Sequence, residues 1–267
     1  MDGHRHTVTS ADGTEIGLLT AGDGPELLLV HGGMGCIESW APLWEPLTSR
    51  WQVTAMDRRG RGSSGDTPPN GAGPYDLSRE FEDVEAVAAS LAGGDAVDVF
   101  GHSYGAVCAL GAAADGAPIR RLALYEPPGP PTVPASWRER MLPMIEAGQP
   151  GRAMMSFLTE IIGLSGEEIA ALRDAPRGYD VMPIVSATMP RESKALSDVD
   201  LKALAAGVEV PVLLILGSAS PAWAQDLTAE VAAALTHETL AVLDGQGHDA
   251  INQAPLLLID QLTGFFS

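Results

Sequence analysis

Short apolar runs alternate with longer segments of helical periodicity along most of this chain of 267 residues. Residues 76–92 repeat apolar side chains at helical spacing, and residues 103–114 form a helical run of small side chains. Strands that alternate with helices predict a mostly parallel sheet with helices on both faces. The runs that are typical of buried strands occupy residues 27–30, 52–56, 96–100, 122–125, 212–216 and 239–243.

The first residues follow a different pattern. The segment HTVTSADGTEIGLL alternates in polarity around Asp12-Gly13, a common two-residue turn pair. We therefore expect an antiparallel hairpin, which brings the predicted sheet to eight strands.

The alternation stops between residues 127 and 206. This stretch opens with five prolines and then becomes helical and rich in methionine. We interpret it as a helical cap inserted over the carboxyl ends of the strands, where open α/β sheets bind their ligands. The predicted organisation is an α/β core at residues 1–126 and 207–267 with a cap at residues 127–206.

A serine between two glycines joins the strand at 96–100 to the helix at 103–114. Gly101-His102-Ser103-Tyr104-Gly105 matches G-x-S-x-G, in which a sharp turn raises the serine hydroxyl above the sheet. The glycines let the strand and the helix approach each other. The strand–turn–helix context favours Ser103 as a nucleophile over a purely structural glycine turn.

A glycine-rich loop, His31-Gly32-Gly33-Met34-Gly35, directly follows the strand at 27–30. Such a loop can direct a backbone N–H into the site, where it would form an oxyanion hole with the N–H of Tyr104. The sequence leaves Gly33 and Met34 as alternative donors. An ordinary strand-end turn is the other interpretation.

His248 lies on a loop after the last predicted strand, late in the chain. Because it follows the nucleophile in the chain and comes from a strand end, we predict it as the general base for Ser103. The competing His237 starts the last strand, and we expect it at the surface.

Together these segments resemble the α/β-hydrolase superfamily. The resemblance rests on HGG at 31–33, DRRGRGSS at 57–64, GHSYG at 101–105 and GQGH at 245–248, and it spans nearly the whole chain outside the cap. It implies an α/β-hydrolase fold with a Ser-His-acid triad. In this resemblance the segment at 57–64 is a structural turn without a catalytic role.

The triad acid departs from the family pattern. The acid usually follows the penultimate strand, about three residues after a glycine. Here Ser220 occupies that position after Gly217, and a serine does not stabilise an imidazolium as a carboxylate does. Some relatives place the acid after the strand that follows the nucleophile helix, which indicates Glu126. The alternatives are Asp226, Asp244 or no acid.

The predicted function is a serine hydrolase that acts through an acyl-enzyme on a small-to-medium, largely apolar ester or related acyl substrate. No cofactor is required, and the six histidines show no metal-ligand spacing. A cofactor-free lyase or cyclase, a C–C bond hydrolase and a non-catalytic ligand-binding protein are the alternatives on the same fold. Candidates for substrate contact, each with core packing as its alternative, are Met34, Ile37, Tyr104, Trp137, Met141, Met144, Met154 and Met155.

The formal charge of −19 disfavours nucleic acids and anionic membranes as partners and leaves a small-molecule substrate. Cys36 and Cys108 are expected to be free thiols in a reducing cytosol. We find no signal-peptide pattern and no apolar run of about 18 residues, so we expect a cytoplasmic protein without a membrane span. A monomer or a homodimer is equally compatible with the sequence.

Overall fold

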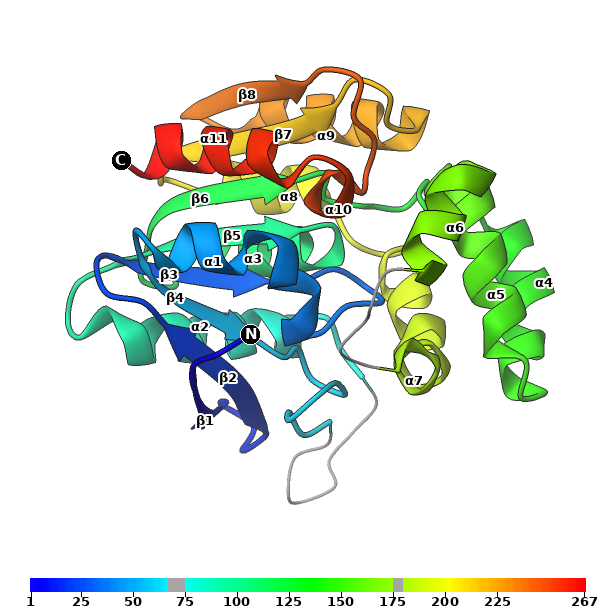
Figure 1. Ribbon diagram of the computed structural model, residues 1–267, viewed down its shortest axis with the longest axis horizontal. Coiled ribbons are helices and arrows are strands. Elements are labelled where there is room, and N and C mark those ends of the chain that lie inside the picture. The colour runs from blue at the N-terminus through cyan, green and yellow to red at the C-terminus, as the bar shows by residue number, and fades with distance from the viewer. Residues whose placement is uncertain (67–74, 175–179) are drawn as a thin grey trace.

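The computed structural model describes residues 1–66, 75–174 and 180–267, and within them eight strands form a single sheet (Figure 1). The order across the sheet is β1-β2-β4-β3-β5-β6-β7-β8. The predicted hairpin is present as β1 and β2, and β2 also runs antiparallel to β4, whereas the other neighbouring strands are parallel. The predicted eight-stranded, mostly parallel sheet is thus confirmed. Its strands are β1 (His4–Thr9), β2 (Glu15–Ala21), β3 (Glu26–Val30), β4 (Gln52–Met56), β5 (Val97–His102), β6 (Ile119–Tyr125), β7 (Val212–Gly217) and β8 (Glu238–Leu243).

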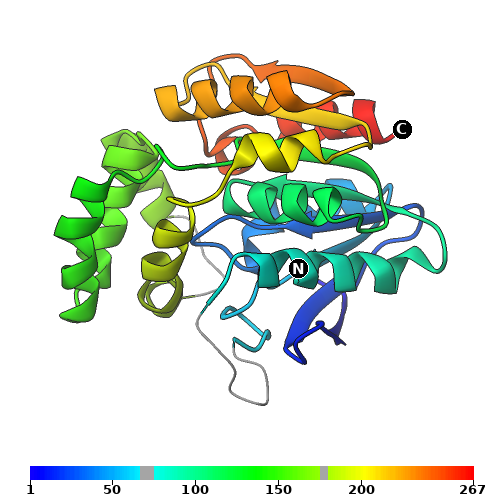
Figure 2. The same ribbon diagram turned by 180° about the vertical axis from the view of Figure 1, so that it is seen from behind.

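Helices cover both faces of the sheet, as predicted. One face carries α1 (Ala41–Thr48), α10 (Ala250–Gln253) and α11 (Pro255–Phe266) (Figure 1). The opposite face carries α2 (Ser78–Ala92), α3 (Tyr104–Ala114), α8 (Leu201–Ala206) and α9 (Ala222–Ala234), which lie in front of the sheet in Figure 2.

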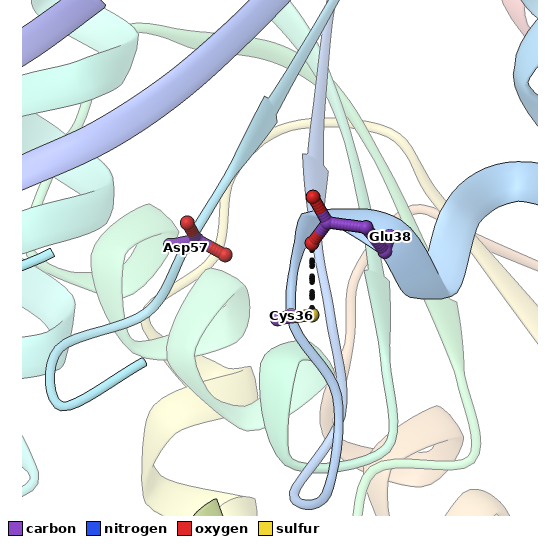
Figure 3. A group of neighbouring side chains, drawn as sticks. All are labelled: Cys36, Glu38 and Asp57. Carbon is purple, nitrogen blue, oxygen red and sulfur yellow. Dashed lines mark hydrogen bonds between the residues drawn. The ribbon is translucent and has the colours of Figure 1, made fainter. Parts of the chain in front are cut away.

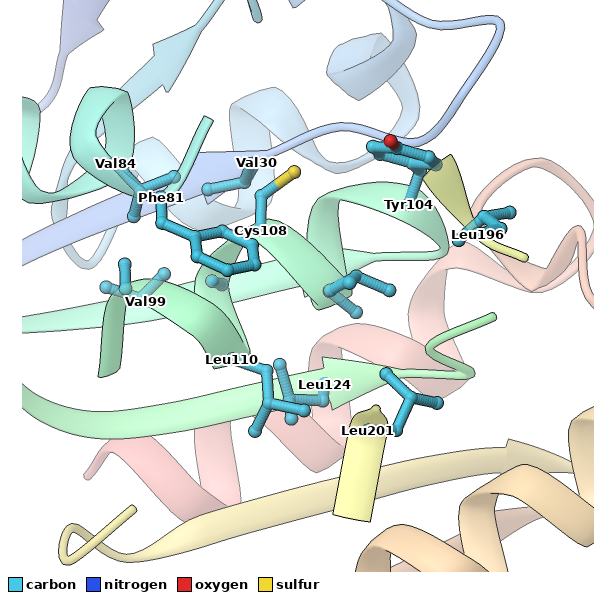
Figure 4. Close-up of a cluster of buried hydrophobic side chains, with 14 of the residues drawn as sticks. Val30, Phe81, Val84, Val99, Tyr104, Cys108, Leu110, Leu124, Leu196 and Leu201 are labelled. Carbon is cyan, nitrogen blue, oxygen red and sulfur yellow. The ribbon is translucent and has the colours of Figure 1, made fainter. Parts of the chain in front are cut away.

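The central strand β3 shows why the strands are apolar throughout. Leu27 and Leu29 join the buried cluster on one face of the sheet, and Leu28 and Val30 join the cluster on the other. Because successive side chains of a strand point to opposite faces, a strand covered on both sides needs apolar residues at every position. Figure 4 shows the cluster that contains Val30, whose side chain lies close to side chains of α2 and α3.

The segment that interrupts the alternation is helical. It contains α4 (Ala135–Glu146), α5 (Pro150–Ser156), the π-helical turn η2 (Phe157–Ile161), α6 (Gly166–Asp174) and α7 (Val181–Ala195), which gather beyond one end of the sheet (Figure 1). The predicted cap segment, residues 127–206, also includes α8, which follows this group of helices. Helix α8 lies with the core helices on the sheet, and its Leu201 is buried in the core cluster. We refer to α4–α7 with η2 as the cap.

Both cysteines are free, as predicted, and both are buried. Among the described residues, no helix is long and apolar enough to span a lipid bilayer.

Candidate active site

Ser103 lies at the turn between β5 and α3, in a backbone conformation that few non-glycine residues adopt. Its φ is 53° and its ψ is −124°, and its N–H donates to the carbonyl of Tyr125 at 2.8 Å. The flanking glycines are required by close packing. A Cβ on Gly101 would lie 2.7 Å from the Cα of Ala106, and one on Gly105 would lie 2.2 Å from the carbonyl oxygen of Val30.

His248 and Glu126 come from two different strand ends and meet in the interior. Nδ1 of His248 lies 2.5 Å from Oε2 of Glu126, whose side chain is fully buried. Glu126 directly follows the last residue of β6 and has a positive φ of 47°. The contact engages Nδ1 of the imidazole and leaves Nε2 available for proton transfer.

The second oxygen of Glu126 is held by the residue that replaces the expected aspartate. Oε1 accepts the N–H of Gly217 at 2.7 Å and the hydroxyl of Ser220 at 2.5 Å. These donors compensate for the loss of hydration of a buried carboxylate. The alternative acids Asp226 and Asp244 are exposed side chains.

The loop that carries His248 is fixed by its neighbours. The carbonyl of Gly247 accepts the hydroxyl of Tyr125, and the carbonyl of His248 accepts Nε2–H of His102 at 3.1 Å. Burial and the neighbouring imidazole of His248 lower the pKa of His102 well below its usual value, so His102 is neutral. His237 is exposed, as predicted.

One cavity of about 810 Å³ lies between the core and the cap. Ser103, His248 and Tyr104 line it from the core, together with the loop residues Gly33 and Met34. The wall from the cap is mostly apolar. Its apolar side chains include Met154, Phe157, Leu158, Ile162, Leu164, Leu172, Val181, Val185 and Met189, and its polar ones are Thr188, Glu192 and Ser193. The geometry therefore offers a serine hydroxyl, an oriented imidazole and an apolar wall to one ligand.

Comparison with known families matches residues 27–261 to the alpha/beta hydrolase family. This chain belongs to the α/β-hydrolase family. A solved alpha/beta hydrolase from Sphaerobacter thermophilus is 36% identical, with a TM-score of 0.82, and the match covers 98% of this chain and 100% of that one. The N-formylmaleamate deformylase of Pseudomonas putida is 28% identical over 253 residues, which are 92% of this chain and 87% of the deformylase. A protein named probable oxidoreductase EphD, from Mycobacterium tuberculosis, is 33% identical over 102 residues, or 38% of this chain, and the match spans only 17% of that protein.

Four of the predicted substrate contacts lie away from the described cavity. Ile37, Trp137, Met141 and Met144 do not line the described cavity of this α/β-hydrolase. Ile37 is fully buried in the core, and Trp137 packs inside the cap, where its Nε1–H donates to Ser156 at 2.9 Å. Met141 and Met144 pack on the same cluster, as does Met155, whereas Met154 lines the cavity. Apolar residues on cap helices serve the interior of the cap as well as the ligand, and composition does not separate the two roles.

A buried ionic group that was not predicted from the sequence lies beside the cavity. Arg58 and Arg61, from the segment interpreted as a structural turn, donate to the carbonyls of Gly32 and Gly33 at 3.3 Å and 2.8 Å. Glu192 of α7 binds both arginines and also lines the cavity. The only signal in the sequence was the density of charge in DRRGRGSS, because Glu192 lies 131 positions from Arg61.

A cluster that resembles a metal-ligand set lies just after the glycine-rich loop. Cys36, Glu38 and Asp57 offer ligand atoms within 4.8 Å of one another (Figure 3). Each already has a hydrogen-bonding role, because Cys36 donates to Glu38 at 3.0 Å and Asp57 accepts the N–H groups of Ile37 and Ser63. Burial and the adjacent carboxylate of Glu38 raise the pKa of the Cys36 thiol, which keeps it protonated. These hydrogen bonds hold the turn that follows the glycine-rich loop.

Proposed function

We propose that this α/β-hydrolase is a cofactor-free serine hydrolase with the triad Ser103, His248 and Glu126. The observation that carries the proposal is the 2.5 Å contact between Nδ1 of His248 and the buried Glu126, because His248 lines the same cavity as Ser103. A carboxylate on Nδ1 holds the imidazole in the tautomer whose Nε2 accepts the proton of a serine hydroxyl.

The proposed mechanism is acyl transfer in two steps. Nε2 of His248 takes the Ser103 proton as Oγ attacks the substrate carbonyl, and the N–H groups of Tyr104 and of Gly33 or Met34 stabilise the oxyanion. The imidazolium then protonates the leaving group as its bond to the carbonyl carbon breaks. Water, activated by the same imidazole, hydrolyses the acyl-enzyme and restores the serine.

The cavity supports a small-to-medium, largely apolar acyl substrate. A volume of about 810 Å³ is in the range of small-molecule sites, and the cap contributes mostly apolar side chains to it. Three acidic residues, Glu38, Glu192 and Asp249, also line the cavity. Glu38 is paired with Arg5, and Glu192 with Arg58 and Arg61, so the choice of substrate class rests on the apolar wall of the cavity. We therefore propose a neutral ester of the carboxylic-ester class.

The test is hydrolysis of a panel of neutral esters and lactones of increasing acyl length by the native protein and by Ser103→Ala. We expect turnover of short and medium esters, with a loss of at least about a thousandfold in kcat for Ser103→Ala. Turnover that survives in Ser103→Ala would contradict the assignment of the nucleophile. A well-folded native protein that hydrolyses no member of the panel would contradict the proposed reaction class.

A further inference from the structure

We propose that Glu192 of the cap is a positioning residue for the oxyanion loop, which we define as residues 31–35. Acting through Arg58 and Arg61, it fixes the direction of the loop peptides whose N–H groups would bind the oxyanion. The consequence for rate rests on the proposed function, whereas the consequence for loop conformation does not.

Glu192 is the carboxylate through which the cap binds both arginines. Its side chain is 6% exposed, and Oε1 accepts Nη2–H of Arg58 at 2.6 Å and Nη2–H of Arg61. Its Oε2 lies 3.5 Å from the position that a Cβ on Gly33 would occupy. Glu192 therefore lies beside the loop and binds it through the two guanidinium groups.

The arginines bind the carbonyl side of the loop. Arg61 donates to the carbonyl of Gly33 at 2.8 Å, and Arg58 donates to that of Gly32 at 3.3 Å. In a trans peptide the C=O and the following N–H point in opposite directions. Holding the Gly33 carbonyl toward Arg61 therefore turns the N–H of Met34 to the opposite side of the loop.

The loop also adjoins the proposed nucleophile. A Cβ on Gly32 would lie 3.1 Å from the Cβ of Ser103. The guanidinium of Arg58 stacks over the ring of Tyr104 at 4.3 Å from its centroid, next to the second proposed donor. One pair of arginines thus contacts both halves of the proposed oxyanion hole.

Charge balance makes Glu192 necessary for this arrangement. Arg58 has a second buried carboxylate partner in Glu80, at 2.6 Å, whereas Glu192 is the only acidic partner of Arg61 among the described residues. Two cations and two anions are buried here, so neutralising Glu192 leaves one uncompensated positive charge. A buried guanidinium without its partner reorients toward water or other acceptors, and the Gly33 carbonyl then loses the hydrogen bond from Arg61. The Gly32 carbonyl keeps its contacts with the N–H of Gly35 and with Nδ1 of His31.

The experiment compares Glu192→Gln, which keeps the side-chain shape, with Glu160→Gln, which neutralises a half-exposed cap residue paired with Arg140. For a short ester we expect kcat to fall about tenfold to a hundredfold in Glu192→Gln, with KM within about twofold. Inhibition by a trifluoromethyl ketone, whose adduct carries an oxyanion, should weaken by a similar factor. Glu160→Gln should match the native protein in all three quantities.

Hydrogen–deuterium exchange supplies a readout that needs no activity. Amides of residues 31–36 should exchange faster in Glu192→Gln and at the native rate in Glu160→Gln. Unchanged exchange and unchanged kcat, or a loss confined to KM, would overturn the positioning role. If Glu192→Gln does not fold, Arg61→Lys tests the same contacts and should show the same kcat loss and faster exchange, because an ammonium does not reproduce the guanidinium geometry. A native protein without hydrolase activity would count against the proposed function alone, and the exchange arm would still decide this inference.

Discussion

Replacing Glu126 with glutamine tests the triad through the tautomer of His248. Oε1 of Glu126 accepts two hydrogen bonds, from the N–H of Gly217 and the hydroxyl of Ser220. In Glu126→Gln the same two donors should hold the amide oxygen where Oε1 of Glu126 lies. The amide NH2 then faces Nδ1 of His248, which has to accept, so the ring proton moves to Nε2. An imidazole protonated on Nε2 does not accept the proton of Ser103.

The expected loss of kcat follows from this change of the His248 tautomer. A triad whose histidine is held in the wrong tautomer loses about 10³- to 10⁴-fold in kcat. This corresponds to about 4–5.5 kcal/mol of transition-state stabilisation. The assay is steady-state hydrolysis of a short chromogenic ester, with thermal unfolding of each variant measured in parallel to exclude a loss of fold.

The sequence offers a compensating control. Ser220 occupies the position where the family usually carries its acid, and its hydroxyl already reaches the carboxylate of Glu126 at 2.5 Å. The double variant Glu126→Gln/Ser220→Asp should therefore recover at least about tenfold of the lost kcat, because an aspartate there restores a carboxylate beside the site. Nearly full activity in Glu126→Gln alone would refute the reasoning about the acid.

Three further predictions concern the scaffold. Gly105→Ala should destabilise the protein by about 3 kcal/mol in urea unfolding, because its Cβ would overlap the carbonyl oxygen of Val30, and an unchanged midpoint would contradict the packing argument. Trp137→Ala should lower the free energy of unfolding by about 3–5 kcal/mol, since Trp137 is buried inside the cap, while a change confined to KM would restore it as a substrate contact. Burial lowers the pKa of His31 and of His102 well below the unfolded value of about 6.5, so the unfolded chain binds more protons. Their contribution to stability is complete above about pH 6.5 and should be lost as pH falls below it, which urea unfolding between about pH 7.5 and 5.5 would detect as a falling midpoint.

The sheet was predictable because its strands are buried on both faces. Continuous apolar runs at residues 27–30 and 212–216 fit no exposed strand, and the intervening helical periodicity left few other topologies. The approach of Glu126 to His248 was predictable for a related reason. Both follow the carboxyl ends of parallel strands, which meet at one edge of the sheet.

The cap was predictable as helical but not in its contacts. Trp137 and Met141 carry the same apolar signal as Met154, and only the packing of the cap helices decides which of them faces the cavity. The contact between Glu192 and the two arginines had no local signal either. It joins residues more than 130 positions apart through side chains whose partners depend on how the cap lies on the core.

The reactivity of Ser103 is tested most directly by intact-mass measurement after treatment with a fluorophosphonate probe. The account predicts a single adduct on the native protein, no adduct on Ser103→Ala and slow labelling of Glu126→Gln. A folded native protein that remains unlabelled, or an adduct that persists in Ser103→Ala, would contradict it.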